Sequence, residues 1–185
     1  MAWQKEHKQH SKDKILLSAA KLFTQNGFAN VSIDQIMQDA QLTRGAFYAH
    51  FNSKSDLYSQ AIIKAALSAQ KTQQQQCCSD NLLTLAKSYL SNDHAHNNSG
   101  ITCPLAALVT DIAQQNETVK ATYTEVFEGF VGSINNKVAG NNIAALQSAV
   151  LMIGGLALAK ALNNSELSEQ LLVACHQAIA DILPS

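Results

Sequence analysis

Apolar residues recur every three or four positions along most of this chain, as they do in helices that bury one face. Residues 11–26 are the first clear example, with apolar side chains at positions 15, 16, 19, 20 and 23. Gly27 follows, and glycine is the residue that most often ends a helix in a left-handed conformation. No run of alternating apolar residues indicates a β-strand, so the pattern predicts an all-α fold.

Two short helices are expected next, over residues 32–40 and 43–50. Ser32 with Gln35 has the spacing of a capping box, and Thr43 is placed to cap the second of the two. Short helices joined by a turn of three or four residues form a helix-turn-helix. The pattern therefore predicts a three-helix head built from this pair and the helix before it.

The remaining pattern predicts a helical body. Ser53 is expected to cap a fourth helix of about 24 residues. Further helices are expected at 81–91, from Cys103-Pro104 onward, and at 116–138, 142–163 and 166–183, giving about nine in all. The polar stretch 91–100, "SNDHAHNNSG", is expected to be a loop.

Charge is divided unevenly between the two parts of the chain. Residues 1–64 carry eight Lys/Arg and five Asp/Glu, whereas residues 65–185 carry five and nine, so the balance changes from +3 to −4. This asymmetry favours a basic recognition domain joined to an acidic body. We expect the recognition domain at 1–54, reaching to about 70 with the start of the fourth helix, and the ligand-binding and dimerisation domain at 55–185. Lysines at 5, 8, 12 and 14 are expected to form a basic flank.

The segment "QLTRGAFYAHFNSK", residues 41–54, contains the only arginine of the chain. Phe47 and Phe51 lie one helical turn apart on one face, and Arg44 and Tyr48 lie one turn apart on another. The planar fork of arginine matches the O6 and N7 acceptors of guanine. The pattern therefore predicts a recognition helix with aromatic anchors behind it and reading groups in front.

The stretch from about residue 11 to 62 resembles the TetR/AcrR family of bacterial transcriptional repressors. The resemblance rests on "ILLSAAKLFTQNGFANVSIDQIMQDA" and "LTRGAFYAHFNSKSDLY". It implies a double-stranded DNA operator as partner, contacted by Ser32, Thr43, Arg44, Gly45, Ala46, Tyr48, His50 and Lys54. Base reading is expected from Arg44, with Ala46 and Tyr48, and phosphate contacts from the others. Gln41 departs from the family, which usually has glycine at this turn.

The C-terminal part also resembles the family, in "CPLAALVTDIA" and "IGGLALAKALNNSELSEQLLVACHQAI". This implies a pocket for a small-molecule inducer, for which the candidate lining residues are Tyr89, Cys103, Leu108, Tyr123, Phe127 and Phe130. The same residues could equally belong to the core. Cys103 precedes Pro104, where a helix N-terminus lowers a thiol pKa. Sensing of an oxidant or electrophile, with Cys77 and Cys78 as partners, is one interpretation; a small residue in a packed turn is the other.

The last two helices carry more apolar surface than one buried stripe requires. Burying the excess across a two-fold axis predicts a homodimer, with Gly154 and Gly155 allowing close helix approach. A dimer would place two recognition helices on a roughly palindromic operator. The apolar stretch 143–162 approaches membrane-spanning length, but its Gln147, Ser148 and Lys160 favour a buried helix over a spanning one.

Other classes of function find little support in the sequence. There is no phosphate-binding glycine loop and no spaced nucleophile set, so we expect no enzyme activity. Asp93, His94 and His96 lie close together in one polar stretch without a further ligand at a metal-binding spacing. We therefore expect neither a metal nor a cofactor. The start has no apolar core of a secretory signal, and the four cysteines follow no disulfide or zinc spacing, which favours the cytoplasm. The alternative is an all-helical scaffold without a DNA role.

Overall fold

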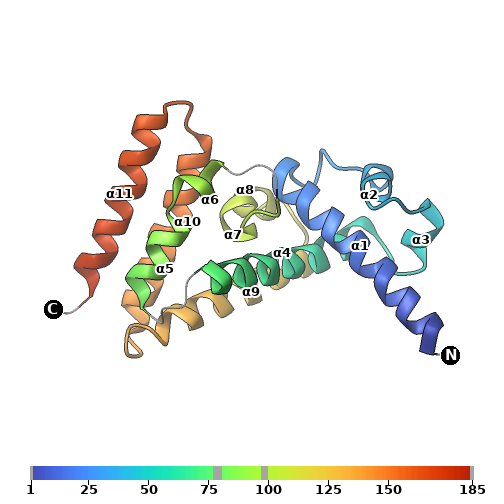
Figure 1. The fold of residues 1–185 in the computed structure, drawn as a ribbon, viewed down its shortest axis with the longest axis horizontal. Helices are drawn as coiled ribbons and strands as arrows, with labels where there is room; N and C mark the ends of the chain where they lie inside the picture. Colours follow the sequence, from blue (N-terminus) through green and yellow to red (C-terminus); the bar gives the residue numbers. More distant parts are fainter. Residues whose placement is uncertain (1, 77–80, 97–99, 184–185) are drawn as a thin grey trace. The chain divides into compact units, whose positions relative to one another are not determined.

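The computed structural model describes residues 2–76, 81–96 and 100–183, and every regular element in these ranges is an α-helix (Figure 1). The expected all-α class is confirmed. The chain forms two compact units, Met1–Ser68 with Gly100–Thr124, and Ala69–Ser99 with Glu125–Ser185. The boundary expected at residues 54 and 55 takes no account of the segment 100–124, which joins the first unit.

The first unit contains the helix-turn-helix and the short helices that pack on it. Its elements are α1 (Ala2–Asn26), α2 (Ile33–Asp39), α3 (Arg44–Tyr48), the start of α4 (Lys54–Gln76), α7 (Pro104–Ala107), α8 (Val109–Ile112) and the start of α9 (Glu117–Asn135). The core between α1, α2, α3 and α4 is fully buried and includes Ile15, Phe23, Ile36, Phe47 and Leu57. Ile15, Phe23 and Phe47 are among the apolar positions that the helical spacing predicts to face inward.

The first helix begins nine residues before the expected start at residue 11. Residues 2–10 are mostly polar and contain no glycine or proline, so nothing interrupts the helix. A helical turn that buries no face leaves no apolar periodicity, which is why the pattern does not reveal it. The extension carries Lys8, which acts electrostatically on His50 just after α3.

Hydrogen bonds fix both ends of α2, and those at its C-terminal end set the turn to α3. Ser32 Oγ accepts from the N–H of Gln35 at 3.2 Å, and Gln35 Oε1 accepts from the N–H of Ser32 at 2.7 Å, so the expected capping box is present. At the other end the N–H of Leu42 donates to the carbonyl of Met37, and the N–H of Gln41 to that of Gln38. Gln41 has φ 57°, the left-handed conformation of a Schellman motif.

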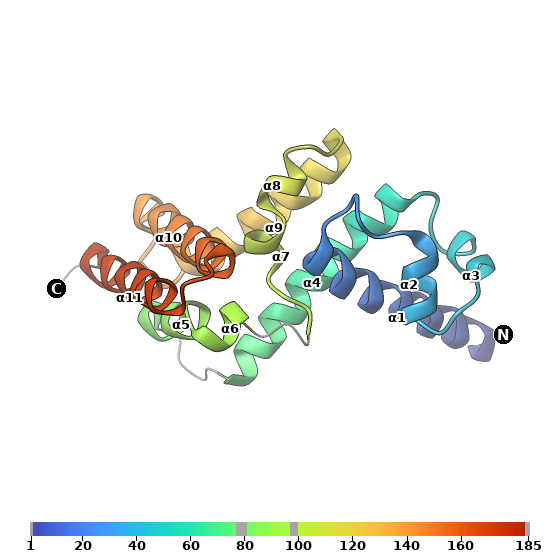
Figure 2. The same cartoon turned by 90° about the horizontal axis from the view of Figure 1, so that it is seen from above.

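The second unit is a small helical bundle. Its helices are α5 (Leu82–Tyr89), α6 (Asn92–His96), α10 (Asn142–Ala161) and α11 (Ser165–Ile182), with the end of α9. α10 lies along α11 and also packs on α5 and α6 (Figure 2). A Cβ added to Gly155 would lie 2.8 Å from Cys175 Sγ and 3.1 Å from Leu90 Cδ2. Gly155 therefore permits close packing inside one protomer, whereas nothing lies within 4 Å of a Cβ at Gly154.

The polar stretch expected to be a loop contains the helix α6, so that expectation is wrong. His94 packs edge-on against Tyr89, with ring centroids 4.9 Å apart, and its Nδ1 lies 2.8 Å from the carbonyl oxygen of Tyr89. Burial lowers the pKa of His94. Tertiary packing thus overrides local polarity here. Within the described residues, no group of three or more His, Cys, Asp or Glu is placed to hold a metal ion.

One described helix, α10, is long and apolar enough to cross a membrane, with a mean hydropathy of 1.7. Half of that apolar window is buried inside the fold. Ser148, Met152 and Leu156 are among its completely buried side chains. Burial of this kind is typical of the core helix of a bundle.

The left-handed turn residue gives a direct stability prediction. Because glycine adopts this conformation without the steric cost that a Cβ brings, Gln41→Gly should raise the free energy of unfolding by roughly 1 kcal/mol. Gln38→Gly, at an exposed position inside α2, should lower it by about the same amount. Urea denaturation measures both. A loss of stability in both variants would contradict the conformation of the turn.

Candidate nucleic-acid interface

Helix α3 is anchored by two aromatic side chains that leave its other face in solvent. Phe47 and Phe51 are buried, and their ring centroids lie 5.8 Å apart. Arg44, Gly45 and Tyr48 are exposed, and Tyr48 retains 61% of its accessible surface. Its ring packs edge-on against that of Phe47, with centroids 5.1 Å apart, and most of its surface remains in solvent. The helix therefore presents an arginine and a tyrosine outward, on the face that the spacing predicts.

Arg44 has a local partner that holds it in position without burying it. Its Nη1 lies 3.2 Å from Asp34 Oδ2 on α2, and the two side chains are 59% and 66% exposed. The Tyr48 hydroxyl and then the Asp34 carboxylate raise the pKa of Arg44. An ion pair this exposed is screened by solvent and contributes little stability. A stronger acceptor can therefore displace Asp34 from the guanidinium.

The small residues around Arg44 leave room for a close approach to α3. Thr43 occupies the N-cap position, but its side chain makes no capping hydrogen bond, contrary to the expected cap. A Cβ added at Gly45 would meet only Thr43 Oγ1, at an ordinary 3.9 Å. The fold itself thus does not require glycine at this position. Ser32 is exposed at the start of α2, and Ala46 is half-buried.

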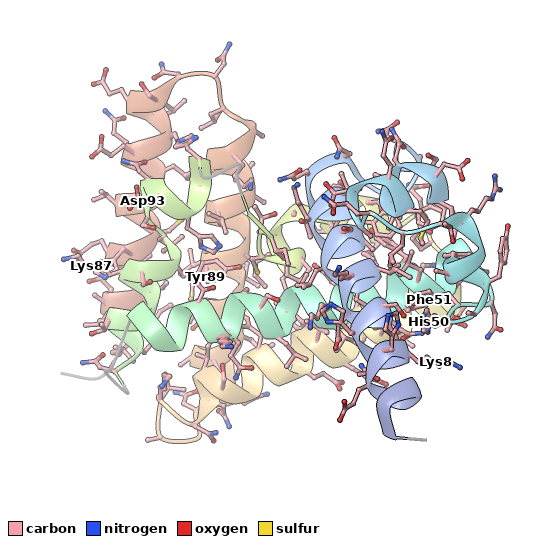
Figure 3. The ribbon with its side chains drawn as sticks, turned by 45° about the vertical axis from the view of Figure 1, so that its right-hand side comes forward. Lys8, His50, Phe51, Lys87, Tyr89 and Asp93 are labelled. Atoms are coloured by element: carbon pink, nitrogen blue, oxygen red, sulfur yellow. The ribbon has the colours of Figure 1, made fainter. Side chains whose placement is uncertain are left out.

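Two of the expected phosphate-contacting residues are held by contacts inside the unit. His50 is half-buried, and its Nε2 lies 2.8 Å from Ser11 Oγ on α1 (Figure 3). Lys54 donates to the carbonyl of Phe28 and lies 4.2 Å from the centroid of the Phe28 ring. Burial lowers the pKa of Lys54. The sequence did not reveal this internal role of Lys54, since its partner lies 26 positions away.

The structure also contains a polar junction that sequence reasoning missed. Asp111 on α8 accepts a hydrogen bond from the Tyr58 hydroxyl of α4 through Oδ2. Its Oδ1 accepts from the N–H of Phe28 at 3.2 Å and would lie 3.3 Å from a Cβ at Gly27. Burial, and then the Asp111 carboxylate, raise the pKa of Tyr58. One carboxylate thus joins α8 to the end of α1 and to α4.

Aromatic packing surrounds this junction. The Tyr58 ring lies 4.7 Å from that of Phe23 and 5.0 Å from that of Phe28, centroid to centroid. Lys54 Nζ also lies over the Phe28 ring. A partly buried network of hydrogen bonds and packed rings favours one arrangement of its elements. A displacement of α8 would therefore disturb the residues just after α1 and the start of α4. Helices α2 and α3 lie between these two segments in the chain.

The candidate ligand-binding residues fall into two groups. Cys103, Leu108 and Tyr123 belong to the first unit, where Cys103 and Leu108 are buried and Tyr123 donates to the carbonyl of Leu105 at 2.7 Å. Burial, with the nearby Cys103 thiol, raises the pKa of Tyr123 to about 12.

The other three belong to the second unit. The rings of Tyr89 and Phe130 pack at a tilt of 36° with centroids 5.6 Å apart, and Phe127 is half-buried. A shared pocket for these residues stays a prediction. Cys77 and Cys78 lie outside the described residues, so their suggested pairing with Cys103 also stays a prediction.

Residues 15–61 match the family model TetR_N, described as bacterial regulatory proteins of the tetR family. In this N-terminal segment the chain is therefore similar to the DNA-binding domain of the TetR family. The matched segment includes α2 and α3. It also includes the residues from the earlier part of the chain that pack around Asp111, which are Phe23, Phe28, Lys54 and Tyr58. Curated sequences of the family show the same likeness over this part of the chain.

The transcriptional regulator AcrR of Shigella flexneri is 43% identical over 56 residues, 30% of this chain and 26% of that protein. The transposon Tn10 TetC protein of Escherichia coli is 41% identical over 56 residues, 28% of its length. IcaR of Staphylococcus aureus, a negative regulator of a biofilm operon, is 33% identical over 51 residues, 27% of its length. The chain thus matches about a quarter of each of these relatives.

Solved TetR-type structures match nearly the whole fold. A TetR-family regulator from Cytophaga hutchinsonii superposes with a TM-score of 0.78 at 17% identity, over 97% of this chain and 98% of that one. The reduced form of NemR from E. coli also gives 0.78, at 15% identity, over 95% and 98%. At these identities the likeness establishes the fold, and the C-terminal body therefore has the TetR architecture as well.

The junction at Asp111 predicts unequal effects for two tyrosine substitutions. Tyr58→Phe removes a donor to a carboxylate and should lower the free energy of unfolding by about 1.5–3 kcal/mol. Tyr123→Phe removes a donor to a neutral carbonyl and should cost only about 0.5–1.5 kcal/mol. Chemical denaturation of both variants provides the comparison. Equal losses would indicate that Asp111 does not hold Tyr58 as described.

Proposed function

We propose that this TetR-family protein is a homodimeric transcriptional repressor that binds a palindromic duplex operator and is released from it by a small-molecule inducer. The observation that carries the proposal is the exposed Arg44–Tyr48 face of α3 inside the segment that the family model matches. The relatives of this chain include a negative transcriptional regulator, which agrees with repression. DNA binding also places the protein in the cytoplasm.

Sequence reading is assigned to α3. An exposed guanidinium whose ion pair with Asp34 is screened by solvent can exchange that carboxylate for the O6 and N7 acceptors of guanine. Tyr48 and Ala46 are placed to contact neighbouring base edges, and Gly45 lets the backbone approach the groove. Ser32, Thr43, His50 and Lys54 remain the candidates for phosphate contacts. Of these, Lys54 would first have to leave Phe28.

Dimerisation is assigned to an apolar stripe on α10 and α11. Ile143, Val150 and Leu158 lie on one face of α10 and are 70%, 63% and 58% exposed. Gly154 lies between Val150 and Leu158 with open space beside it. Leu167 and Val173 of α11 are also exposed, on different sides of that helix. The exposed apolar face of α10 supports an interface there, and a two-fold axis would let it pack against the same face of a second copy.

Induction is assigned to a two-state change in the body of the protein. An inducer must bind the arrangement that cannot fit DNA better than the one that can. In the first unit, α7 and α8 carry or adjoin Cys103, Leu108 and Asp111, so a ligand that moves α8 would act on the Asp111 junction.

The burial of Cys103 favours its role as a small residue in a packed turn over a role as a sensing thiol. The test is operator release by peroxide or an electrophile. If release persists in Cys103→Ser, a sensing role of this thiol is ruled out.

The alternative of a helical scaffold without a DNA role makes the opposite prediction for binding. A scaffold would bind no duplex from the promoter region beside its own gene. A repressor would bind one such duplex, and added salt would weaken the complex steeply because phosphate contacts release counterions.

Replacement of the single arginine tests sequence reading. Arg44→Ala should weaken binding to the cognate duplex roughly ten- to a hundredfold and relax the preference at one base pair in each half-site. Lys87→Ala, at an exposed position of the second unit, provides the control and should change neither. Fluorescence-anisotropy titrations on a panel of single-substitution duplexes measure this. Equal losses on every duplex would show that Arg44 contacts phosphate instead.

A charge placed in the apolar stripe tests the dimer. Val150→Glu should give a protein with the mass of one subunit, because a carboxylate at the centre of the interface would lose its water without a partner. Asn163→Glu adds the same charge in the exposed turn after α10 and should remain dimeric. Light scattering after size exclusion gives the masses, and circular dichroism confirms folding. A dimeric Val150→Glu variant would place the interface elsewhere.

A further inference from the structure

The N-terminal extension of α1 brings positive charge to the side of the recognition helix. Lys8 and Lys12 lie one helical turn apart and therefore share a face of α1. Lys12 Nζ lies 5.7 Å from the centroid of the Phe51 ring, just after α3. Figure 3 shows Lys8, His50 and Phe51 gathered at the same place. Both lysines are close enough to act electrostatically on His50.

The acidic residue nearest in sequence to this pair is engaged elsewhere. Asp13 lies 3.7 Å from Lys64 of α4 and accepts a hydrogen bond from Gln9. It therefore does not neutralise the face that Lys8 and Lys12 share.

A hydrogen-bond chain fixes the imidazole between these lysines. Ser11 Oγ donates to the carbonyl of Lys8 at 2.9 Å, so its hydrogen is used. The same oxygen must then accept from His50 Nε2–H, from which it lies 2.8 Å away. Nδ1 of the neutral ring is therefore the nitrogen that can take up a proton. A protonated ring would donate from both nitrogens.

We propose that Lys8, Lys12 and His50 form a phosphate-binding site for the DNA backbone that flanks the base pairs read by α3. The inference rests on the proposed DNA-binding function and extends the contact surface to α1. Charge complementarity carries it: two ammonium groups act on an imidazole that lies two positions beyond the exposed Tyr48 at the end of α3. Duplex DNA is the polyanion that a cationic group beside an exposed recognition helix fits.

The site makes DNA binding depend on pH. In the free protein, burial and then the charges of Lys8 and Lys12 lower the pKa of His50, so the ring is neutral near neutral pH. These two lysines of α1 are the charged groups that act on the ring. A phosphate placed here would offset their charge and favour the imidazolium, so binding takes up a proton. Affinity must then rise as the pH falls through the range in which histidine titrates.

The test is a titration of a duplex selected by the wild-type protein from a random pool. Removing both charges in the Lys8→Gln/Lys12→Gln variant should weaken binding several-fold on all sequences alike. It should also reduce the slope of log affinity against log salt by about 0.9 for each phosphate that the variant no longer neutralises. Lys8→Gln alone, which leaves the Lys12–Phe51 contact intact, should show half of that reduction. The Lys71→Gln/Lys87→Gln variant removes the same charge from exposed positions of the second unit and should keep the wild-type slope.

A pH series tests the role of His50. Wild-type affinity should rise between about pH 8 and pH 5, and His50→Gln, which retains His7 and His10, should show a smaller rise. An unchanged salt slope in the double lysine variant, while the wild type binds its duplex, would overturn the proposed site alone. Equal pH dependence in the wild type and His50→Gln would overturn the assignment of His50. Failure of the wild type to select any duplex would overturn the proposed function itself.

Discussion

The packing of Phe47 and Phe51 against the core is the constraint on which the recognition face depends. Helix α3 is only five residues long, too short to be stable alone, so its orientation comes from these two buried rings. Once they are fixed, helical geometry leaves Arg44 and Tyr48 no direction but outward. The turn before α3 adds to this constraint, since Gln41 takes up a left-handed conformation to close it.

The junction at Asp111 connects this head to the short helices that follow it in the first unit. Its carboxylate accepts from Tyr58 and from the backbone of Phe28, two segments 30 residues apart, while itself lying in α8. Any motion of α8 must either carry α1 and α4 with it or break these bonds, so the junction would give the proposed inducer a physical route to the head. The proposed repression and induction would then depend on the same set of contacts.

Local signals predicted the head well. Residues within a few positions of one another specify the capping box at Ser32, the left-handed helix end at Gly27 and the two faces of α3. The contacts that the sequence did not reveal are long-range: Asp111 with Tyr58, Lys54 with Phe28, and His50 with Ser11 join residues 26 to 53 positions apart. The α1 extension and α6 were missed for a related reason, because neither shows the apolar period on which the predictions rest.

The most direct test of base reading by α3 asks whether the Arg44 side chain contacts the N7 atom of one particular guanine. Replacing each guanine of the selected duplex by 7-deazaguanine removes only the N7 acceptor, and anisotropy then measures the affinity of wild-type protein and of Arg44→Ala for each duplex. The account predicts one position in each half-site where the wild type loses affinity and Arg44→Ala does not. Equal losses for both proteins at every guanine would contradict a guanidinium of α3 reading the major groove.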